Sequence, residues 1–385
     1  MTEVLEWHNA ADSPAIIRRT VKALAEGHVV AFPTETVYGL AASALLPEAV
    51  ERLCMGKGRS ESKPLALAIR GSAEARDWVP QMSPLGWRLA RRCWPGPLTL
   101  VFADSVNEGL ASRLPERVRQ RVCPSGTLGL RTPAHAAIWE TLCRLPGPLA
   151  LSSANRSGEP AATTAEEVRQ SIGEDVALLI DDGPTRYRQA STVVQVNGNA
   201  WSVLREGVLT SAELELQACC LIVFVCTGNT CRSPLAEVLC KKLLAERLGC
   251  TPEELPHRGF MVMSAGLAAS MGGEAAPEAI ETARELGADL RGHMSRPLTA
   301  KLVAQADFLI TMTNSHLLAL ASQYRGLGPR PRLLSEHDED LPDPIGCEIG
   351  VYQACARQIL RDLEALLPQF EMGGVLSRPI ISEPC

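Results

Sequence analysis

LIVFVCTGNTCRSPLAEVLC, residues 221–240, decides the fold of the second half of the chain. Its first six residues are continuously apolar and rich in β-branched side chains, as in a strand buried on both faces of a parallel sheet. A loop with Gly and Asn follows, and then a helix with Pro234 in its first turn. This order predicts that the loop lies at the carboxyl edge of a sheet, where α/β proteins bind ligands.

The chemistry of this loop is that of an anion site with a nucleophile. Five residues separate Cys226 from Arg232, so backbone N–H groups can surround one phosphate at the positive end of the helix dipole. Arg232 can bind two phosphate oxygens, and the same field favours the thiolate form of Cys226. Ser233 can donate a hydrogen bond to that sulfur. Most chance Cys-x5-Arg pairs are structural, but the preceding strand and the following helix favour catalysis.

A phosphatase of this kind also needs a general acid for its leaving group. Asp343, in Leu-Pro-Asp-Pro, is the candidate, although an Asp in a Pro-rich loop also often starts a turn. Further strands are expected at 261–266 and 306–312, alternating with helices. These units predict a small doubly wound parallel sheet over residues 220–370. The tail is expected to be irregular after Pro368.

Residues 221 to about 368 resemble the low-molecular-weight protein-tyrosine phosphatase family. The motifs that carry the resemblance occur in the order of that family: SAG at 264–266, GHMSRPLT at 292–299, ADFLITMT at 306–313 and DP at 343–344. The resemblance implies that Cys226 forms a phosphocysteine and that Arg232 stabilises the transferring phosphoryl group. It also implies that Asp343 acts first as the acid and then as the base.

Two positions bear on the substrate of this half. Thr230 stands where the tyrosine phosphatases of the family usually have an aliphatic residue, and where its protein-arginine-phosphatase subgroup has threonine. Ile345 and Gly346 follow the Asp-Pro pair, whereas the tyrosine phosphatases have aromatic residues there, which suit a phosphotyrosine ring. Both differences favour phosphoarginine. The alternatives are that Thr230 is only a small loop residue and that the substrate is phosphotyrosine.

The first half, residues 1–210, has a mixed α/β pattern. A helix is expected at 14–27, and HVVAFPTETVYGLA then indicates a strand that runs into a loop. Further short apolar runs follow, separated by helical stretches: LALAI, LTLVF, LGL, LALSS, ALLID and STVVQV. A mixed twisted sheet with helices is therefore expected. Residues 208–219 are expected to be a short connection.

Polar clusters beside these strands indicate a nucleotide site. They supply many cations and hydroxyls but few acid–base or metal-ligating groups, which suits catalysis by positioning and electrostatics. No Walker loop and no GxGxxG motif is present. The clusters are PTETVYGL, GKGRSESKP, TLGLRTPAH, SSANRSG, STVV and LREG.

Six motifs in order, PTETVYGL, KGR, WPGPLTL, SANRSG, STVV and REG, make the chain resemble the YrdC family, the L-threonylcarbamoyladenylate synthases, over roughly residues 10–210. The resemblance implies that L-threonine, bicarbonate and ATP react to give threonylcarbamoyl-AMP and pyrophosphate. ATP would bring Mg²⁺ with it, and the product would serve tRNA threonylcarbamoyladenosine synthesis together with partner proteins of that modification. By motif, the threonine-binding residues are Thr36, Arg131, Ser153 and Ser191. The ATP-binding residues are Arg59, Lys63, Thr127, Asn155, Thr163 and Arg205, with Lys57 near the phosphates or the bicarbonate.

The alternative for the first half is a nucleotide- or RNA-binding module without synthase activity, fused to a tyrosine phosphatase. Its support is a basic run with Arg113, Arg117, Arg119, Arg121 and Arg131, together with Ala68, which replaces a frequent histidine of the family. A second departure from the family pattern is Ser60, which replaces a frequent proline.

Composition is that of a soluble globular protein, and a cytoplasmic location is expected. Hydrophobic residues make up 46% and charged residues 21%, and the net charge of −6 excludes a basic nucleic-acid module by bulk charge. The 13 cysteines form no Cys-x-x-Cys pair and no cluster of zinc type, which indicates a reducing cytosol and no metal site. No apolar run approaches the roughly 20 residues of a membrane span, and the N-terminus is expected to carry no signal peptide.

Overall fold

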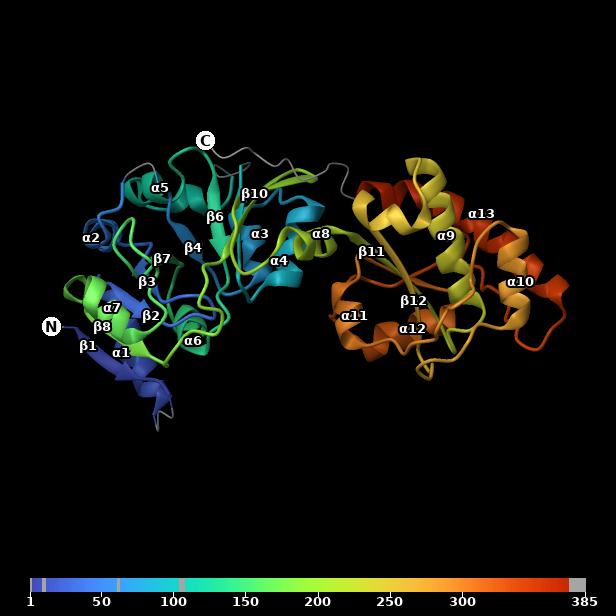
Figure 1. Ribbon diagram of the computed structural model, residues 1–385, viewed down its shortest axis with the longest axis horizontal. Helices are drawn as coiled ribbons and strands as arrows, with labels where there is room; N and C mark the ends of the chain where they lie inside the picture. Colours follow the sequence, from blue (N-terminus) through green and yellow to red (C-terminus); the bar gives the residue numbers. More distant parts are fainter. Residues whose placement is uncertain (1, 9–11, 61–62, 104–107, 374–385) are drawn as a thin grey trace. The chain divides into compact units, whose positions relative to one another are not determined.

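The computed structural model describes residues 2–8, 12–60, 63–103 and 108–373. The chain divides into two compact units, the first ending at Gln217 and the second beginning at Ala218. Figure 1 shows that each unit is built around its own sheet.

The first unit contains a mixed ten-stranded sheet in the order β1-β8-β2-β3-β7-β4-β6-β5-β9-β10. The sheet contains both parallel pairs, such as β5 with β9, and antiparallel pairs, such as β3 with β7. This confirms the expected mixed α/β architecture. The strands are β1 (Glu3–Glu6), β2 (Val30–Phe32), β3 (Gly39–Ser43), β4 (Ala66–Ala68), β5 (Leu98–Phe102), β6 (Leu128–Arg131), β7 (Leu149–Ser153), β8 (Leu178–Asp181), β9 (Thr192–Asn197) and β10 (Ala200–Arg205).

Helices cover this sheet, and α1, α4, α6 and α7 begin at residues whose side chains cap them. In the first helix, for example, the Asp12 side chain accepts a hydrogen bond from the backbone N–H of Ala15, and a proline stands in the first turn. The helices are α1 (Ser13–Ala25), α2 (Pro47–Lys57), α3 (Ser72–Trp78), α4 (Pro84–Cys93), α5 (Glu116–Val122), α6 (Ala136–Arg144), α7 (Ala165–Ile172) and α8 (Ser211–Ala218), with 3₁₀ turns at Leu110–Arg113 and Gly173–Asp175. Helices α1 and α6 pack together in one core with β2 and β7.

The second unit is a four-stranded parallel sheet in the order β12-β11-β13-β14. Its strands are β11 (Cys220–Cys226), β12 (Phe260–Gly266), β13 (Phe308–Thr311) and β14 (Arg332–Leu333). Its helices are α9 (Arg232–Leu248), α10 (Pro277–Glu285), α11 (Ala300–Gln305), α12 (Asn314–Gln323) and α13 (Ile349–Gly373), with a 3₁₀ segment at Pro252–Arg258.

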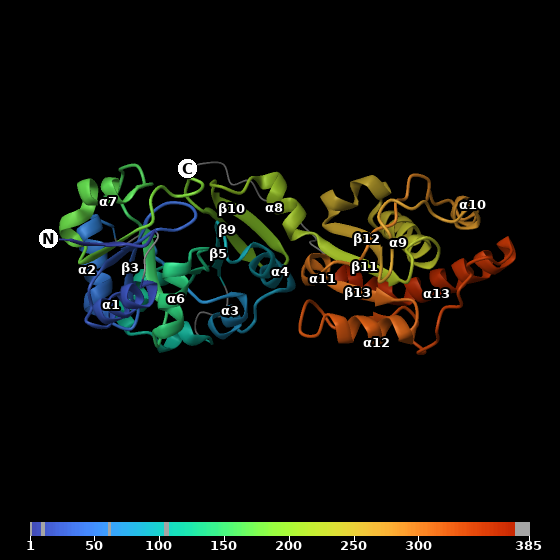
Figure 2. The ribbon, with the colours of Figure 1, turned by 90° about the horizontal axis from the view of Figure 1, so that it is seen from below.

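Both faces of the second sheet are covered, as the apolar run of β11 predicts. Ile222 and Phe224 pack into the core under α9 and α13. Val223 and Val225 point the other way, into the core under α11 and α12. Figure 1 shows these two helical layers on opposite sides of the sheet, and Figure 2 views the same sheet from the side of α11 and α12. The expected doubly wound parallel sheet is therefore confirmed.

Three local expectations were wrong. Residues 208–219, which were expected to be a short connection, contain helix α8. Strand β3 follows the PTETVY segment, where the sequence predicted only a loop. The third concerns the tail, because α13 continues through Pro368 to Gly373. Leu366, Leu367 and Phe370 are buried in the core on either side of that proline, and this packing outweighs the lost backbone hydrogen bond. Residues 374–385 lie outside the described residues.

No helix within the described ranges combines the length and the apolar character that a membrane crossing needs.

Candidate active sites

Cys226 lies at the carboxyl end of β11, on the floor of the loop that leads into α9. Its side chain is only 3% exposed. The sulfur accepts a hydrogen bond from the backbone N–H of Asn229 at 3.2 Å and lies 3.0 Å from the Ser233 hydroxyl. The Ser233 oxygen accepts a bond from the Asn229 amide, and its own proton can point to the sulfur or to the carbonyl oxygen of Ala265 at 3.5 Å. Hydrogen-bond donors placed in this way suit a sulfur that acts as a nucleophile.

Asn229 holds the loop in shape. Its backbone has a φ of 57°, in the left-handed region that Asn tolerates better than most residues. The side-chain amide donates to Ser233 at 3.0 Å and to Ser264 at 2.8 Å, and its oxygen accepts the backbone N–H of Arg296. His293 bonds its backbone carbonyl at 2.9 Å. The buried amide is therefore fully partnered, and this makes the cradle rigid.

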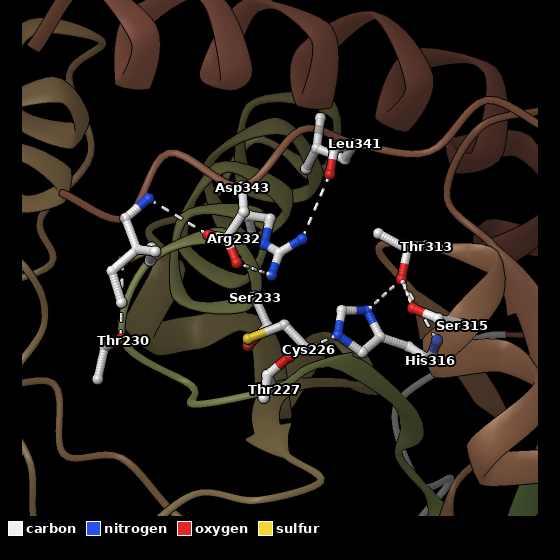
Figure 3. A network of polar contacts seen from close by, with 12 residues as sticks. Cys226, Thr227, Thr230, Arg232, Ser233, Thr313, Ser315, His316, Leu341 and Asp343 are labelled. Carbon is white, nitrogen blue, oxygen red and sulfur yellow. Dashed lines mark hydrogen bonds and ion pairs between the residues drawn. The ribbon is translucent and has the colours of Figure 1, made fainter. Parts of the chain in front are cut away.

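Arg232, the first residue of α9, lies beside Asp343. Figure 3 shows its guanidinium between Asp343 and the carbonyl of Leu341. One terminal nitrogen donates to the Asp343 carboxylate at 2.5 Å and the other to Leu341 at 3.3 Å. The Arg232 side chain is 7% exposed and that of Asp343 is 47% exposed. The structure thus places Arg232, the candidate cation, and Asp343, the candidate acid, beside Cys226 at the opening of the loop that holds the nucleophile.

Thr230 lies on the same loop, one residue beyond Asn229. Its hydroxyl is 3.6 Å from the sulfur of Cys231. That sulfur also lies 3.5 Å from the hydroxyl of Tyr352, which is 1% exposed. The Tyr352 ring is therefore packed inside the core and does not form an aromatic wall at the mouth.

The first unit has a cavity of about 190 Å³ above β3, β5 and β7. Six of the predicted residues line it together: Arg59, Thr127, Arg131, Ser153, Ser191 and Arg205. Three guanidinium groups around one small cavity create a positive potential that suits a polyanion.

Arg131 is fixed from behind by Glu35 and Thr36. One terminal nitrogen donates to the Glu35 carboxylate and to the Thr36 hydroxyl, both at 2.8 Å. The other Glu35 oxygen accepts the backbone N–H of Ala134. The Nε of Arg131 is buried and has no partner among the described residues. A buried unpaired donor of this kind is costly without a ligand, so it fits an anionic substrate group. Thr36 thus positions Arg131 and does not itself line the cavity.

Arg205 reaches the cavity because Gly207 lets its segment approach β9 closely. A Cβ at Gly207 would lie 2.3 Å from the carbonyl oxygen of Ala190. Arg205 then donates to the backbone oxygen of Ser191 at 2.7 Å and to its hydroxyl at 3.1 Å. Arg59 donates to the Ser152 hydroxyl at 3.1 Å. Burial lowers the pKa of both arginines.

Lys57, at the end of α2, holds the SANRSG loop. Its ammonium donates to the carbonyl oxygens of Ser153 and Asn155, each at 2.7 Å, and to both of their side chains. Four acceptors exceed the three protons of an ammonium group. Burial, with Arg59 and Lys63 nearby, lowers the pKa of Lys57 to about 8. Lys57 and Asn155 thus position the loop that carries Ser153.

Like Lys57 and Asn155, the predicted ATP residues Lys63 and Thr163 are not among the residues that line this cavity. Lys63 is exposed. Thr163 bonds Glu167 through its N–H and its hydroxyl, and lines a separate hollow with that residue. Ala68, in β4, is fully buried in the core.

Several residues with clear roles in these sites were missed from the sequence. They are Thr34, Glu35, Thr99 and Ser152 in the first unit, and Ser264, His293 and His316 in the second. Most of them lie inside motifs that can be recognised in the sequence, but their individual roles could not be assigned from it. The pairing between motifs depends on strand order, which no local pattern reveals.

Comparisons with known proteins agree with the two sites. Residues 22–207 match the model of the Sua5, YciO and YrdC family, described as telomere recombination. Residues 221–373 match the model described as low molecular weight phosphotyrosine protein phosphatase.

Individual relatives match each half separately. A putative threonylcarbamoyl-AMP synthase of Mycobacterium leprae is 36% identical over 217 residues, which are 56% of this chain and 93% of that protein. A protein-arginine-phosphatase of Bacillus subtilis is 40% identical over 152 residues, which are 38% of this chain and 92% of that protein. A solved structure of Sua5 from P. abyssi has a TM-score of 0.50 at 27% identity, covering 70% of this chain and 92% of its own. The chain therefore belongs to two enzyme families in tandem: its first half is a member of the Sua5/YrdC family, and its second half is a member of the low-molecular-weight phosphatase family.

Proposed function

We propose that the second unit is a protein phosphatase that works through a phosphocysteine and prefers phosphoarginine. The observation that carries this proposal is the cradle of Cys226, Ser233 and Arg232 with Asp343 at its mouth. The Cys226 thiolate attacks phosphorus, the bond to the leaving group breaks, and Asp343 gives the leaving nitrogen its proton. Water then attacks phosphorus, Asp343 takes its proton, and the S–P bond breaks to release phosphate.

The Arg232–Asp343 contact fits this sequence of steps. A phosphoryl group held by the Arg232 fork replaces Asp343 as the partner of the guanidinium. The carboxyl group of Asp343, which is half-exposed, is then available to the leaving group.

The preference for phosphoarginine rests on Thr230 and on the residues after Asp343. Ile345 is 66% exposed and Gly346 has no side chain, so this segment offers no ring to stack on phosphotyrosine. Tyr352, the next aromatic residue in the chain, is buried against Cys231. The Bacillus subtilis relative is called a protein-arginine-phosphatase, which agrees with this preference.

The test compares a phosphoarginine peptide and a phosphotyrosine peptide of the same sequence, with Cys226→Ser as the inactive control. We expect the wild type to prefer phosphoarginine, and Thr230→Ile to shift the ratio of the two kcat/KM values toward phosphotyrosine by about tenfold or more. A wild-type preference for phosphotyrosine would establish a tyrosine phosphatase instead.

We further propose that the first unit makes threonylcarbamoyl-AMP from L-threonine, bicarbonate and ATP, for the threonylcarbamoyladenosine modification of tRNA. The cavity with Arg59, Arg131 and Arg205 supports this. Arg59, Thr127 and Arg205 are assigned to ATP, and Arg131, Ser153 and Ser191 to threonine. Within the described ranges, no group of His, Cys, Asp or Glu residues is suited to hold a metal ion, so Mg²⁺ would be held by the triphosphate itself.

Release of pyrophosphate from ATP tests this activity. It should require both L-threonine and bicarbonate, and Arg131→Ala should abolish it. Nucleotide binding without such release would favour the alternative, a binding module without synthase activity.

A further inference from the structure

The second unit contains a hydrogen-bonded chain that the proposed reaction does not use. The Thr227 hydroxyl lies 2.8 Å from Nε2 of His316, and Nδ1 of the same ring lies 2.8 Å from the Thr313 hydroxyl. Thr313 caps α12 and also accepts the backbone N–H of His316. The imidazole is thus held at both nitrogens and through its backbone.

This chain ends beside the nucleophile. Thr227 directly follows Cys226, and it is exposed whereas Cys226 and His316 are buried. Figure 3 shows the Thr227 side chain next to Cys226, with the His316 ring behind it. The backbone carbonyl of Thr227 accepts the N–H of Ala268, so the residue is anchored on both sides. Its hydroxyl therefore has a fixed place at the rim of the cradle.

The surroundings of the ring favour its neutral form. Burial and the nearby positive charge of Arg232, on α9, lower the pKa of His316, while Asp343 and Asp340, on the loop before α13, oppose the shift. A neutral imidazole has one N–H and one acceptor nitrogen. It therefore engages the Thr227 hydroxyl once and leaves at least one oxygen lone pair of Thr227 for a ligand at the mouth.

A guanidino leaving group brings N–H donors to the mouth, whereas the ring of a phenolic leaving group brings only C–H edges. We propose that Thr227 accepts a hydrogen bond from the guanidino group of a phosphoarginine substrate, and that His316 is the positioning residue that holds the Thr227 hydroxyl in place. This rests on the proposed phosphoarginine activity and adds a second selectivity element to Thr230.

The test is a double-mutant cycle on the full chain with Thr227→Val, His316→Gln and the pair. Thr227→Val keeps the shape of the side chain and removes the hydroxyl, and Thr227→Ser is the matched variant that keeps it. Each protein is assayed on a phosphoarginine peptide and on p-nitrophenyl phosphate, whose leaving group has no N–H. Thermal melts establish that each variant is folded.

We expect Thr227→Val to lower kcat/KM for phosphoarginine about tenfold more than for p-nitrophenyl phosphate. Thr227→Ser should restore most of that ratio. His316→Gln should lower the ratio in the wild-type background and change it less than twofold when Thr227 is already Val, because its effect passes through Thr227.

Two results would overturn the proposal. Equal losses on both substrates in Thr227→Val would show a purely structural role, and a His316→Gln effect that persists unchanged in the Thr227→Val background would show that His316 acts elsewhere. A wild type that cleaves p-nitrophenyl phosphate but not phosphoarginine would instead refute the proposed function, and this inference with it.

Discussion

Burial and the nearby charge of Arg232 oppose protonation of His316, and this makes the stability of the fold depend on pH. Its pKa in the folded chain lies below the ordinary value of 6.5. Between the two pKa values the unfolded chain therefore binds a proton that the folded chain does not. Since folding then excludes a proton, the free energy of unfolding falls as the pH drops below 6.5.

We expect the wild type to lose more thermal stability than His316→Gln between pH 7.5 and pH 5.5. Glutamine carries no charge at either pH, and both proteins share all other titrating groups, so the difference isolates the imidazole. Calorimetry of the two full-length chains measures it. Identical pH dependence in the two proteins would contradict the assigned direction.

At the scale of single residues, the sequence predicts which side chains carry reactive groups better than it predicts which residues those side chains bond in the fold. Cys226, Ser233 and Arg232 could be placed because one strand, one loop and one helix carry all three. Lys57 is predicted to lie near the phosphates or the bicarbonate, and in the structure its ammonium bonds the loop that carries Ser153 and Asn155. That role depends on residues about one hundred positions away, which only the folded sheet brings close.

At the scale of elements, β12 packs closely against the catalytic loop. A Cβ on Gly266 would lie 2.4 Å from the carbonyl oxygen of Thr227 and 3.1 Å from the backbone nitrogen of Asn229. Both contacts are with backbone, so the loop has to move if the side chain grows. The glycine at the end of β12 thus sets the distance between a strand and the phosphate cradle.

Gly266→Ala should therefore lower kcat/KM for p-nitrophenyl phosphate by roughly a hundredfold, since displacements of about 1 Å have effects of this size. Gly249→Ala is the matched control. It adds the same methyl group at the end of α9, where φ is 61° and nothing lies within 4 Å of the new Cβ. We expect it to cost about 1 kcal/mol of stability without this loss of rate. Full activity in Gly266→Ala would show that the contact is not limiting.

The elements divide into those with local signals and those without. Strand β11 and helix α9 could be predicted because a buried apolar run, Pro234 and the left-handed Gly249 mark their limits. Strand β3 could not, because its small residues give no periodic pattern and it is defined by pairing with β2 and β7. The last turns of α13 depend on core contacts that override the local effect of Pro368.

At the scale of the whole molecule, each unit has its own core. The apolar clusters under α9 and α13 and under α11 and α12 draw only on the second unit, and the cluster with α1 and α6 only on the first. The catalytic candidates divide in the same way. We therefore expect the two activities to be lost separately.

Cys226→Ser should abolish phosphatase activity and leave pyrophosphate release within about twofold of the wild type, because mutations in separate units without shared partners act independently. Arg131→Ala should have the opposite pattern. Phosphatase activity and pyrophosphate release, each measured on Cys226→Ser and on Arg131→Ala, test this independence. Loss of both activities in either variant would show that the two sites are coupled.

The depth of Cys226 also determines which electrophiles can reach it. Its sulfur is almost fully enclosed and lies at the start of a helix, beside a guanidinium. A small anion is attracted into this space, whereas a bulky neutral reagent is excluded by size. Covalent labelling of the chain's 13 cysteines should consequently depend on the charge of the reagent, with iodoacetate selecting Cys226 and larger neutral maleimides selecting the exposed Cys143 and Cys347.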